Sequence, residues 1–224
     1  MLRNGPTKRM LLAVVLLLGC ITLALSQETE TASFFSEEIS DSVFALMQGK
    51  SYKKDTTIPR SELRLVHVLH YDFDGNIKQG EIICNKAISK DLEDIFSTLF
   101  ENKYPIEKIR PIDEYDADDE CSMTDNNTSC FNWRPIAGSK KLSAHSQGLA
   151  IDINPLYNPM VKTRNGKQIV APRASSAYAN RAKSFPGKID RNDLCYKLFT
   201  AKGFSWGGNW KSSKDYQHFE KRIP

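Results

Sequence analysis

The feature that most constrains the fold is the segment from Ser143 to Pro155, which reads Ser-Ala-His-Ser-Gln-Gly-Leu-Ala-Ile-Asp-Ile-Asn-Pro. It places His145 seven positions before Asp152, and this aspartate stands between two isoleucines. A carboxylate in such apolar surroundings is costly to bury unless it is paired with a charge or bound to a metal ion. The segment therefore predicts a buried polar site within a β-forming stretch.

The spacing of His145 and Asp152 also makes a geometric prediction. The Ile-Asp-Ile run, which Pro155 stops, favours a strand over a helix. On a regular strand an odd offset puts two side chains on opposite faces. Both can reach one ion only if the chain bends between them, and Gly148 is the residue that permits a bend. We therefore expect His145 on a turn that leads into the strand and Asp152 within it.

A second segment of the same chemical kind, Asp-Tyr-Gln-His, begins at Asp215 and ends at His218. Two histidines and two carboxylates from separated segments can form a zinc site with a general base beside it. We expect a loop containing Asp215 that leads into a short strand containing His218. Spacing alone leaves an alternative open, in which His145 caps a turn, Asp152 pairs with Arg134 and no metal binds.

The remainder of the chain predicts a mixture of strands and helices. Residues 63–73 and 77–84 are rich in β-forming residues and are separated by Asp-Gly-Asn, which predicts a hairpin. Shorter elements are expected as well: a helix over residues 41–47 and strands over 106–112, 150–154 and 216–220.

Two longer helices are predicted from apolar periodicity and from capping residues. Ser89 is a suitable N-cap for a helix over residues 90–102, and Asp190 is one for a helix over residues 191–202. Between the central segment and the second helix, residues 155–186 show weak periodicity. A stretch of this length is typical of a functional lid or rim.

Three other groups of residues contain the side-chain types of a metal site or a disulfide. Residues 113–120 carry six acidic side chains without the regular spacing of a calcium loop, so a solvated loop is expected. His67 and His70 have an odd spacing on a strand, so they face opposite sides and cannot bind one metal there. Of the four cysteines after the leader, Cys121 and Cys130 bracket a turn-rich loop and are the best candidates for a disulfide, although free thiols remain an alternative.

The N-terminus is typical of an export signal. Three basic residues precede an apolar run over residues 11–25, which is short for a membrane span and suits the core of a secretory signal. Cleavage before Gln27, acylation of Cys20 and retention as a membrane anchor are the alternatives. All of them predict a folded part outside the cytoplasm, in the periplasm or at the cell surface.

Composition sets the domain plan and limits the partners. We expect residues 1–26 to be a signal or anchor, 27–58 a polar linker and 59–224 one folded domain.

The formal net charge of +4 includes three basic residues of the leader, which has no acidic residue. The rest of the chain has 28 basic and 27 acidic residues and therefore carries a net charge of +1. This charge offers no argument for a nucleic-acid partner. A monomer is expected, with membrane contact only through the N-terminal segment.

Two motifs together resemble one enzyme family. They are Ser-x-His-x-x-Gly-x-Ala-x-Asp over residues 143–152 and Asp-x-x-His over residues 215–218. They resemble the zinc D-Ala-D-Ala carboxypeptidase family, which includes vancomycin-resistance carboxypeptidases, D,D-dipeptidases and L-alanyl-D-glutamate endopeptidases. The Trp-Gly-Gly-x-Trp element over residues 206–210 looks most like the endopeptidase branch, in which the base is often aspartate. The resemblance covers roughly residues 60–224.

The resemblance implies a site and a reaction. His145, Asp152 and His218 would be the zinc ligands, Asp215 the general base, and Arg134 the cation that steadies the substrate carbonyl and the developing oxyanion. The implied activity is that of a zinc metallopeptidase which cuts peptidoglycan stem peptides by attack of a zinc-bound water. Both an L-Ala-D-Glu endopeptidase and a D,D-carboxypeptidase are compatible with the motifs.

The resemblance also implies a fold for residues 59–224. It is a small α+β zinc peptidase domain, with an antiparallel sheet flanked by helices, of the type shared with the hedgehog signalling domain. The alternative function on the same fold is a non-catalytic cell-wall-binding or signalling module.

Overall fold

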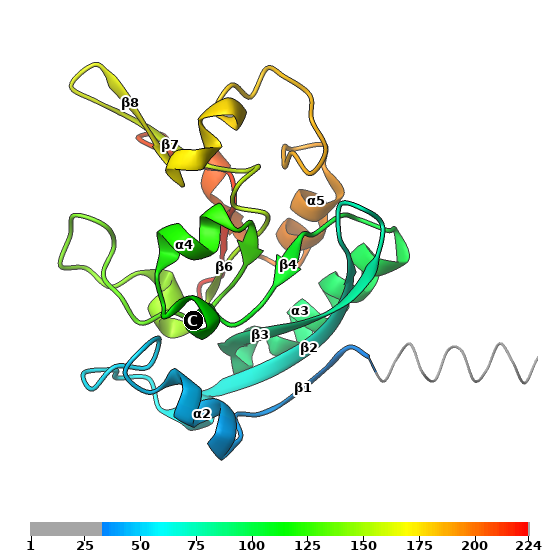
Figure 1. Ribbon diagram of the computed structural model, residues 1–224, viewed down its shortest axis with the longest axis vertical. Coiled ribbons are helices and arrows are strands. Elements are labelled where there is room, and N and C mark those ends of the chain that lie inside the picture. The colour runs from blue at the N-terminus through cyan, green and yellow to red at the C-terminus, as the bar shows by residue number, and fades with distance from the viewer. Residues whose placement is uncertain (1–32, 224) are drawn as a thin grey trace, which may run out of the picture.

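The computed structural model describes residues 33–223 as helices combined with several small sheets, most of them antiparallel (Figure 1). The expected α+β class is confirmed. The expectations for residues 1–26 lie outside the described residues. Within residues 33–223, no helix has the length and apolar character needed to cross a membrane.

The helices and strands follow one another along the whole of the described chain. The helices, with η marking 3-10 turns, are α2 (Asp41–Met47), η1 (Arg60–Glu62), α3 (Lys86–Glu101), η2 (Ile112–Tyr115), α4 (Asp119–Thr124), η3 (Ala144–Gln147), η4 (Arg173–Tyr178), α5 (Leu194–Ala201) and η5 (Gly207–Asn209). The strands are β1 (Phe35–Glu38), β2 (Leu63–Tyr71), β3 (Ile77–Asn85), β4 (Lys108–Ile109), β5 (Asn127–Thr128), β6 (Ala150–Asp152), β7 (Met160–Arg164), β8 (Lys167–Ala171), β9 (Ser205–Trp206), β10 (Lys214–Asp215) and β11 (His218–Glu220).

The hairpin expected over residues 63–84 is present as β2 and β3, which pair antiparallel along their full lengths. Asp72 closes the turn, since its carboxylate accepts the backbone N–H groups of Asp74 and Asn76 at 3.0 and 2.8 Å. β1 adds a third strand to this sheet, in the order β1-β2-β3. The long helix α3 lies along one face of the sheet (Figure 1).

Residues 33–58, where a polar linker was expected, belong to the folded unit. β1 pairs antiparallel with β2, and α2 packs Met47, which is fully buried, into a small core with Leu65 and Trp133. The Ser40 hydroxyl caps α2 by accepting the backbone N–H of Val43. The polar composition was misleading because this segment buries only a few isolated apolar side chains, among them Ile39, Met47 and Ile58, and joins the sheet through the backbone of residues 35–38.

Both long helices are present, but each begins at a different residue from the one expected. α3 starts at Lys86 and is capped by Asn85, whereas the Ser89 hydroxyl donates to a carbonyl inside the first turn. α5 is capped by Asp193 instead of Asp190. In each case two residues with good capping chemistry stand three or four positions apart, and tertiary packing selects between them.

Residues 155–186 contain more regular structure than the expected rim. β7 and β8 form an antiparallel hairpin that projects from the body (Figure 1), and β10 pairs with the other edge of β7. At its tip, Asn165 and Gly166 both adopt positive φ. An Asn-Gly pair is the preferred two-residue hairpin turn, so the sequence did contain the signal.

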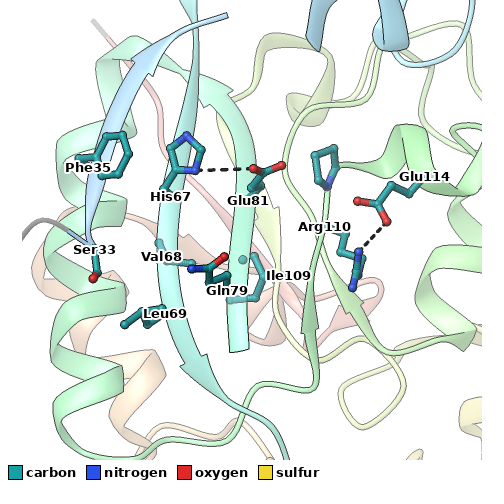
Figure 2. A pocket seen from close by; sticks show the side chains of 12 residues that line it. Ser33, Phe35, His67, Val68, Leu69, Gln79, Glu81, Ile109, Arg110 and Glu114 are labelled. Carbon is teal, nitrogen blue, oxygen red and sulfur yellow. Dashed lines mark hydrogen bonds and ion pairs between the residues drawn. The ribbon is translucent and has the colours of Figure 1, made fainter. Parts of the chain in front are cut away.

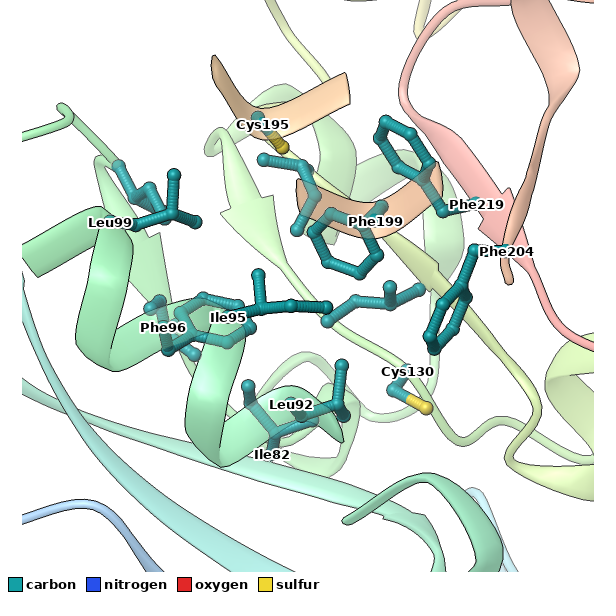
Figure 3. Close-up of a cluster of buried hydrophobic side chains, with 14 of the residues drawn as sticks. Ile82, Leu92, Ile95, Phe96, Leu99, Cys130, Cys195, Phe199, Phe204 and Phe219 are labelled. Carbon is teal, nitrogen blue, oxygen red and sulfur yellow. The ribbon is translucent and has the colours of Figure 1, made fainter. Parts of the chain in front are cut away.

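The main core lies beneath the strands β6 and β11. Side chains from α3, α5 and β11 meet there, and Phe199 stacks on Phe219 with ring centroids 4.5 Å apart (Figure 3). Ile151 and Phe219 are fully buried, and each stands next in sequence to a residue of the polar site. Side chains alternate along a strand. When Ile151 and Phe219 point into the core, their neighbours Asp152 and His218 therefore point to the opposite face.

Two further expectations are corrected. Cys84, Cys121, Cys130 and Cys195 are all free thiols; Cys121 is exposed on α4 while Cys130 faces the core, so the suggested pair is not formed. Residues 113–120 are not a solvated loop, because they form η2 and the start of α4. Within that run Asp113 is buried and accepts hydrogen bonds from the backbone and hydroxyl of Ser51.

Candidate metal centre

His145 lies on the 3-10 turn η3, at the point where the chain turns toward β6. The Ser143 hydroxyl caps this turn by accepting the His145 backbone N–H at 3.3 Å. Gly148 ends the turn in the left-handed conformation, with φ of 63°. A Cβ at Gly148 would lie 2.6 Å from the backbone nitrogen of Asn85, so the bend also depends on the missing side chain. The predicted bend at Gly148 is confirmed.

Asp152 and His218 come from two strands that pair directly. β6 and β11 are antiparallel, and His218 is the register partner of Asp152. β11 is the central strand of its small sheet, with β9 on the other side. Hydrogen bonding between strands therefore brings together two side chains that are 66 residues apart in the chain.

The three side chains converge, and one potential ligand atom from each lies within 4.8 Å of the others. His145 Nε2 is 3.2 Å from His218 Nδ1, and Asp152 is 3.0 Å from His218 Nδ1 and 3.4 Å from His145 Nε2. Both histidines are buried, whereas Asp152 is slightly exposed. The set of two imidazoles and one carboxylate fits a zinc site that keeps one position open.

The outer nitrogen of each imidazole has its own acceptor. His145 Nδ1–H donates to the Cys130 carbonyl at 2.6 Å, and His218 Nε2–H faces a Glu220 carboxylate oxygen at 3.4 Å. Because the protons are on these outer nitrogens, His145 Nε2 and His218 Nδ1 present lone pairs to each other and to the Asp152 carboxylate. Such a group of facing acceptors is stable only with a cation among them, as in metal sites whose histidines are oriented by outer acceptors.

The electrostatics indicate the same need for positive charge. Burial alone would raise the pKa of Asp152, but His145 and His218 outweigh that effect and hold it well below its usual range. Burial alone would lower the pKa of His218, but its hydrogen bonds to Asp152 and Glu220 raise this pKa to about 10. Without a metal, therefore, a proton at His218 supplies the charge that the site requires.

Asp215 stands beside this cluster but outside it. It lies in the two-residue strand β10, opposite Met160 of β7, and not in the loop that was expected. Burial and the nearby charge of Asp152 raise the pKa of Asp215 to about 6. One carboxylate oxygen, Oδ1, is buried without a hydrogen-bond partner among the described residues. A buried carboxylate with a free acceptor atom is suited to taking a proton from a bound molecule.

Residues 137–221 match the family model for D-alanyl-D-alanine carboxypeptidase.

The match contains His145, Asp152, Asp215 and His218, and it begins three residues after Arg134. It supports membership of this zinc-dependent peptidase family as a whole, without selecting one of its members. Together with the convergent His-Asp-His cluster, it supports a peptidase that uses a metal ion. No solved structure matches the chain.

Arg134 is positioned next to the turn that carries His145. The Arg134 backbone N–H donates to the Ser146 hydroxyl at 3.0 Å, and the Arg134 carbonyl accepts the Ser143 N–H at 3.1 Å. Its guanidinium forms an ion pair with Asp119. The alternative of an ion pair between Arg134 and Asp152 is therefore not what the structure shows.

Several residues that border the candidate site were not assigned from the sequence. Glu220 is two positions after His218, so the two side chains share a strand face, and this spacing was a usable signal. The centroid of the Trp210 ring lies 5.2 Å from the centroid of the His218 ring. Gly207 packs so closely that an added Cβ would lie 2.6 Å from the Asp215 carbonyl and 3.3 Å from His218 Cβ. The Trp-Gly-Gly-x-Trp motif thus places Trp210 beside His218 and allows the close approach of Gly207 to Asp215.

A separate cavity of about 500 Å³ lies on the face of the β1-β2-β3 sheet opposite α3 (Figure 2). Phe35, His67, Glu81 and Arg110 line it, and none of the residues of the candidate metal centre does. His67 is held between glutamates there, whereas His70 is buried against the carbonyl of Ile106. As expected, these two histidines do not share a site.

Proposed function

We propose that this chain is a zinc metallopeptidase that hydrolyses peptide bonds in peptidoglycan stem peptides. The observation that carries the proposal is the convergence of His145, Asp152 and His218 beside a buried carboxylate oxygen of Asp215 that has no hydrogen-bond partner within residues 33–223. The family match over residues 137–221 supports the peptidase chemistry. In this proposal the three convergent side chains are the zinc ligands.

The reaction divides between the metal and the protein. A zinc ion held by His145, Asp152 and His218 would supply Lewis-acid chemistry, which acidifies water and polarises a carbonyl group. Asp215 takes a proton from the attacking water, because its carboxylate is buried next to the cluster and one of its oxygens accepts no hydrogen bond from any described residue. Arg134 presents its guanidinium to the substrate carbonyl oxygen as negative charge develops there. Trp210 and the body of the fold limit the access of bulk water to His218.

The choice of scissile bond is part of the proposal. The Trp-Gly-Gly-x-Trp element favours an L-Ala-D-Glu endopeptidase, and a D,D-carboxypeptidase is the alternative within the family. The β7–β8 hairpin is suited to influence this choice, because β7 pairs with the strand that carries Asp215. We also propose the hedgehog-type zinc fold for residues 59–224, on the same resemblance.

The substrate implies a location, and the N-terminal sequence supports it. We propose that the protein is exported to the periplasm or cell surface, by a leader at residues 1–26 that is cleaved, acylated at Cys20 or retained as an anchor. Peptidoglycan lies outside the membrane, so export brings the enzyme to its substrate. We propose that the chain acts as a monomer.

Digestion of purified muropeptides by the zinc-loaded protein tests this function. Mass spectrometry of the products is expected to show cleavage of a stem peptide, and the position of the cut separates the endopeptidase from the carboxypeptidase. Asp215→Ala, assayed in parallel, is expected to bind zinc without cleaving. Zinc binding by the wild-type protein without cleavage of any stem peptide would favour the cell-wall-binding or signalling module instead.

A further inference from the structure

The carboxylate of Asp119 is bound at both oxygens by the chain segment that leads to the metal centre. Oδ2 forms the ion pair with Arg134 Nε, and Oδ1 accepts a hydrogen bond from the side-chain amide of Asn132 at 3.0 Å. Asn132 is buried, while Asp119 and Arg134 are each less than one-third exposed. Asp119 is therefore built into the structure and is not one more solvated acid in residues 113–120.

The same segment is bonded to the turn that carries His145. The backbone N–H of Asn132 donates to the carbonyl of His145 at 3.2 Å, and the backbone of Arg134 is bonded to Ser143 and Ser146 on either side of that histidine. One short stretch thus contacts the metal-site turn through its backbone and Asp119 through its side chains.

The ion pair uses only one edge of the guanidinium. Arg134 Nε is buried and its contact with Asp119 is an ion pair without hydrogen-bond geometry, and no ion pair or hydrogen bond within residues 33–223 involves Nη1 or Nη2. An arginine held at Nε keeps two parallel N–H groups for a carbonyl or an oxyanion. Its long side chain would otherwise sample many rotamers, and a carboxylate at Nε restricts them before substrate binds.

Asp119 is itself held by the helix that it begins. It is the first residue of α4, and the next residue, Glu120, accepts the backbone N–H of Arg173 at 2.8 Å. This contact ties α4 to η4, which follows the β7–β8 hairpin. The Asp119 carboxylate is therefore held between residues 132–134 on one side and the contact of α4 with η4 on the other.

We propose that Asp119 is a positioning residue, which orients the Arg134 guanidinium toward the scissile carbonyl. This inference rests on the proposed peptidase function, and it assigns to the acidic segment a role in transition-state stabilisation. Asp119 does not itself touch substrate. Its effect passes through Arg134, and this distinction can be measured.

A double-mutant cycle tests the inference with Asp119→Asn, Arg134→Ala and the combined variant, all in the full-length zinc-loaded protein. We expect Asp119→Asn to lower kcat by about 10- to 100-fold with unchanged zinc content. The combined variant should be no slower than Arg134→Ala alone, since both changes remove one function. Asp118→Asn is the matched control: Asp118 caps α4, asparagine caps equally well, and activity should be unchanged.

An unchanged or increased kcat in Asp119→Asn would overturn the proposal, as would independent, multiplicative losses in the combined variant. A second readout does not depend on activity. The Arg134 Nε–H resonance, assigned by its absence in Arg134→Lys, should exchange slowly with solvent in the wild-type protein and rapidly in Asp119→Asn. Equal exchange would also contradict the proposal. If the wild-type protein cleaves no stem peptide, the proposed function fails while this comparison still decides whether Asp119 holds Arg134.

Discussion

Asp152 and His218 face each other across neighbouring antiparallel strands, with 3.0 Å between Oδ1 and Nδ1. This relationship fixes two of the three candidate ligands through backbone pairing, before any metal binds. A slip of one residue in the β6–β11 register would turn one ligand to the opposite face and place a core side chain in the site. The stacking of Phe219 on Phe199 opposes such a slip, because Phe219 follows His218 directly.

The first prediction concerns the base. Asp215→Asn keeps the shape of the side chain and removes its ability to accept a proton, so kcat should fall by about 10²- to 10⁴-fold. Zinc content should not change, because Asp215 is outside the group of convergent ligand atoms. Steady-state kinetics and metal analysis of the same preparation check both parts. Full activity in Asp215→Asn would remove this residue from the mechanism.

The second prediction is an acid limb in the pH–rate profile. Burial and the charge of Asp152 raise the pKa of Asp215 to about 6, and a base acts only when it is ionised. As the pH falls through that value, Asp215 gains a proton and kcat should decline. A bound cation stabilises the carboxylate, so the midpoint should lie at about 6 or below. The profile is measured on zinc-loaded protein, with zinc content followed at each pH. A limb centred well above pH 6 at constant zinc content would contradict the assignment.

The third prediction concerns Gly207, whose φ is ordinary and whose restriction is purely steric. A Cβ there would lie 2.6 Å from the Asp215 carbonyl and 2.9 Å from Asp215 Cβ. Gly207→Ala should therefore displace the base and lower kcat. Gly80→Ala is the control, since its Cβ would lie 2.6 Å from Ile109 Cβ, away from the site. Both variants should lose stability, and only Gly207→Ala should lose more activity than its folded fraction explains.

The fourth prediction separates backbone strain from steric clash at the bend. Gly148 and Gly166 have φ of 63° and 71°, but only at Gly148 does an added Cβ meet backbone, at 2.6 Å from Asn85 nitrogen. Gly166→Ala should cost about 1 kcal/mol of unfolding free energy from conformational strain. Gly148→Ala adds overpacking and should cost a further 1–3 kcal/mol or so. Urea unfolding at unchanged slope measures both values, and equal losses would show that the close approach at Gly148 is unimportant.

The candidate site could be found from sequence because its chemistry conflicts with its surroundings. Asp152 between isoleucines requires a partner, and the odd offset from His145 requires a bend, for which Gly148 is the available residue. Strong local patterns also located the β2–β3 hairpin and the apolar face of α3. These features depend on neighbours in the chain, so the sequence expresses them directly.

Other features depend on contacts between distant segments, which local patterns do not encode. The pairing of β1 with β2 draws residues 35–38 into the main sheet although their composition is polar. The choice of Asn85 over Ser89 as a cap depends on how α3 packs. The ion pair between Asp119 and Arg134 joins an acidic run to an arginine fifteen positions later, and neither residue indicates the other.

Zinc binding tests the central claim most directly. Metal content and zinc affinity, the latter by competition with a chromogenic chelator, are compared for the wild-type protein, His145→Ala, Asp152→Ala, His218→Ala and His67→Ala. We predict about one zinc per chain in the wild-type protein and in His67→Ala, because His67 lies in the separate cavity, and loss of tight binding in the other three. Absence of zinc binding by the wild-type protein, or equal affinity in His218→Ala, would contradict the account.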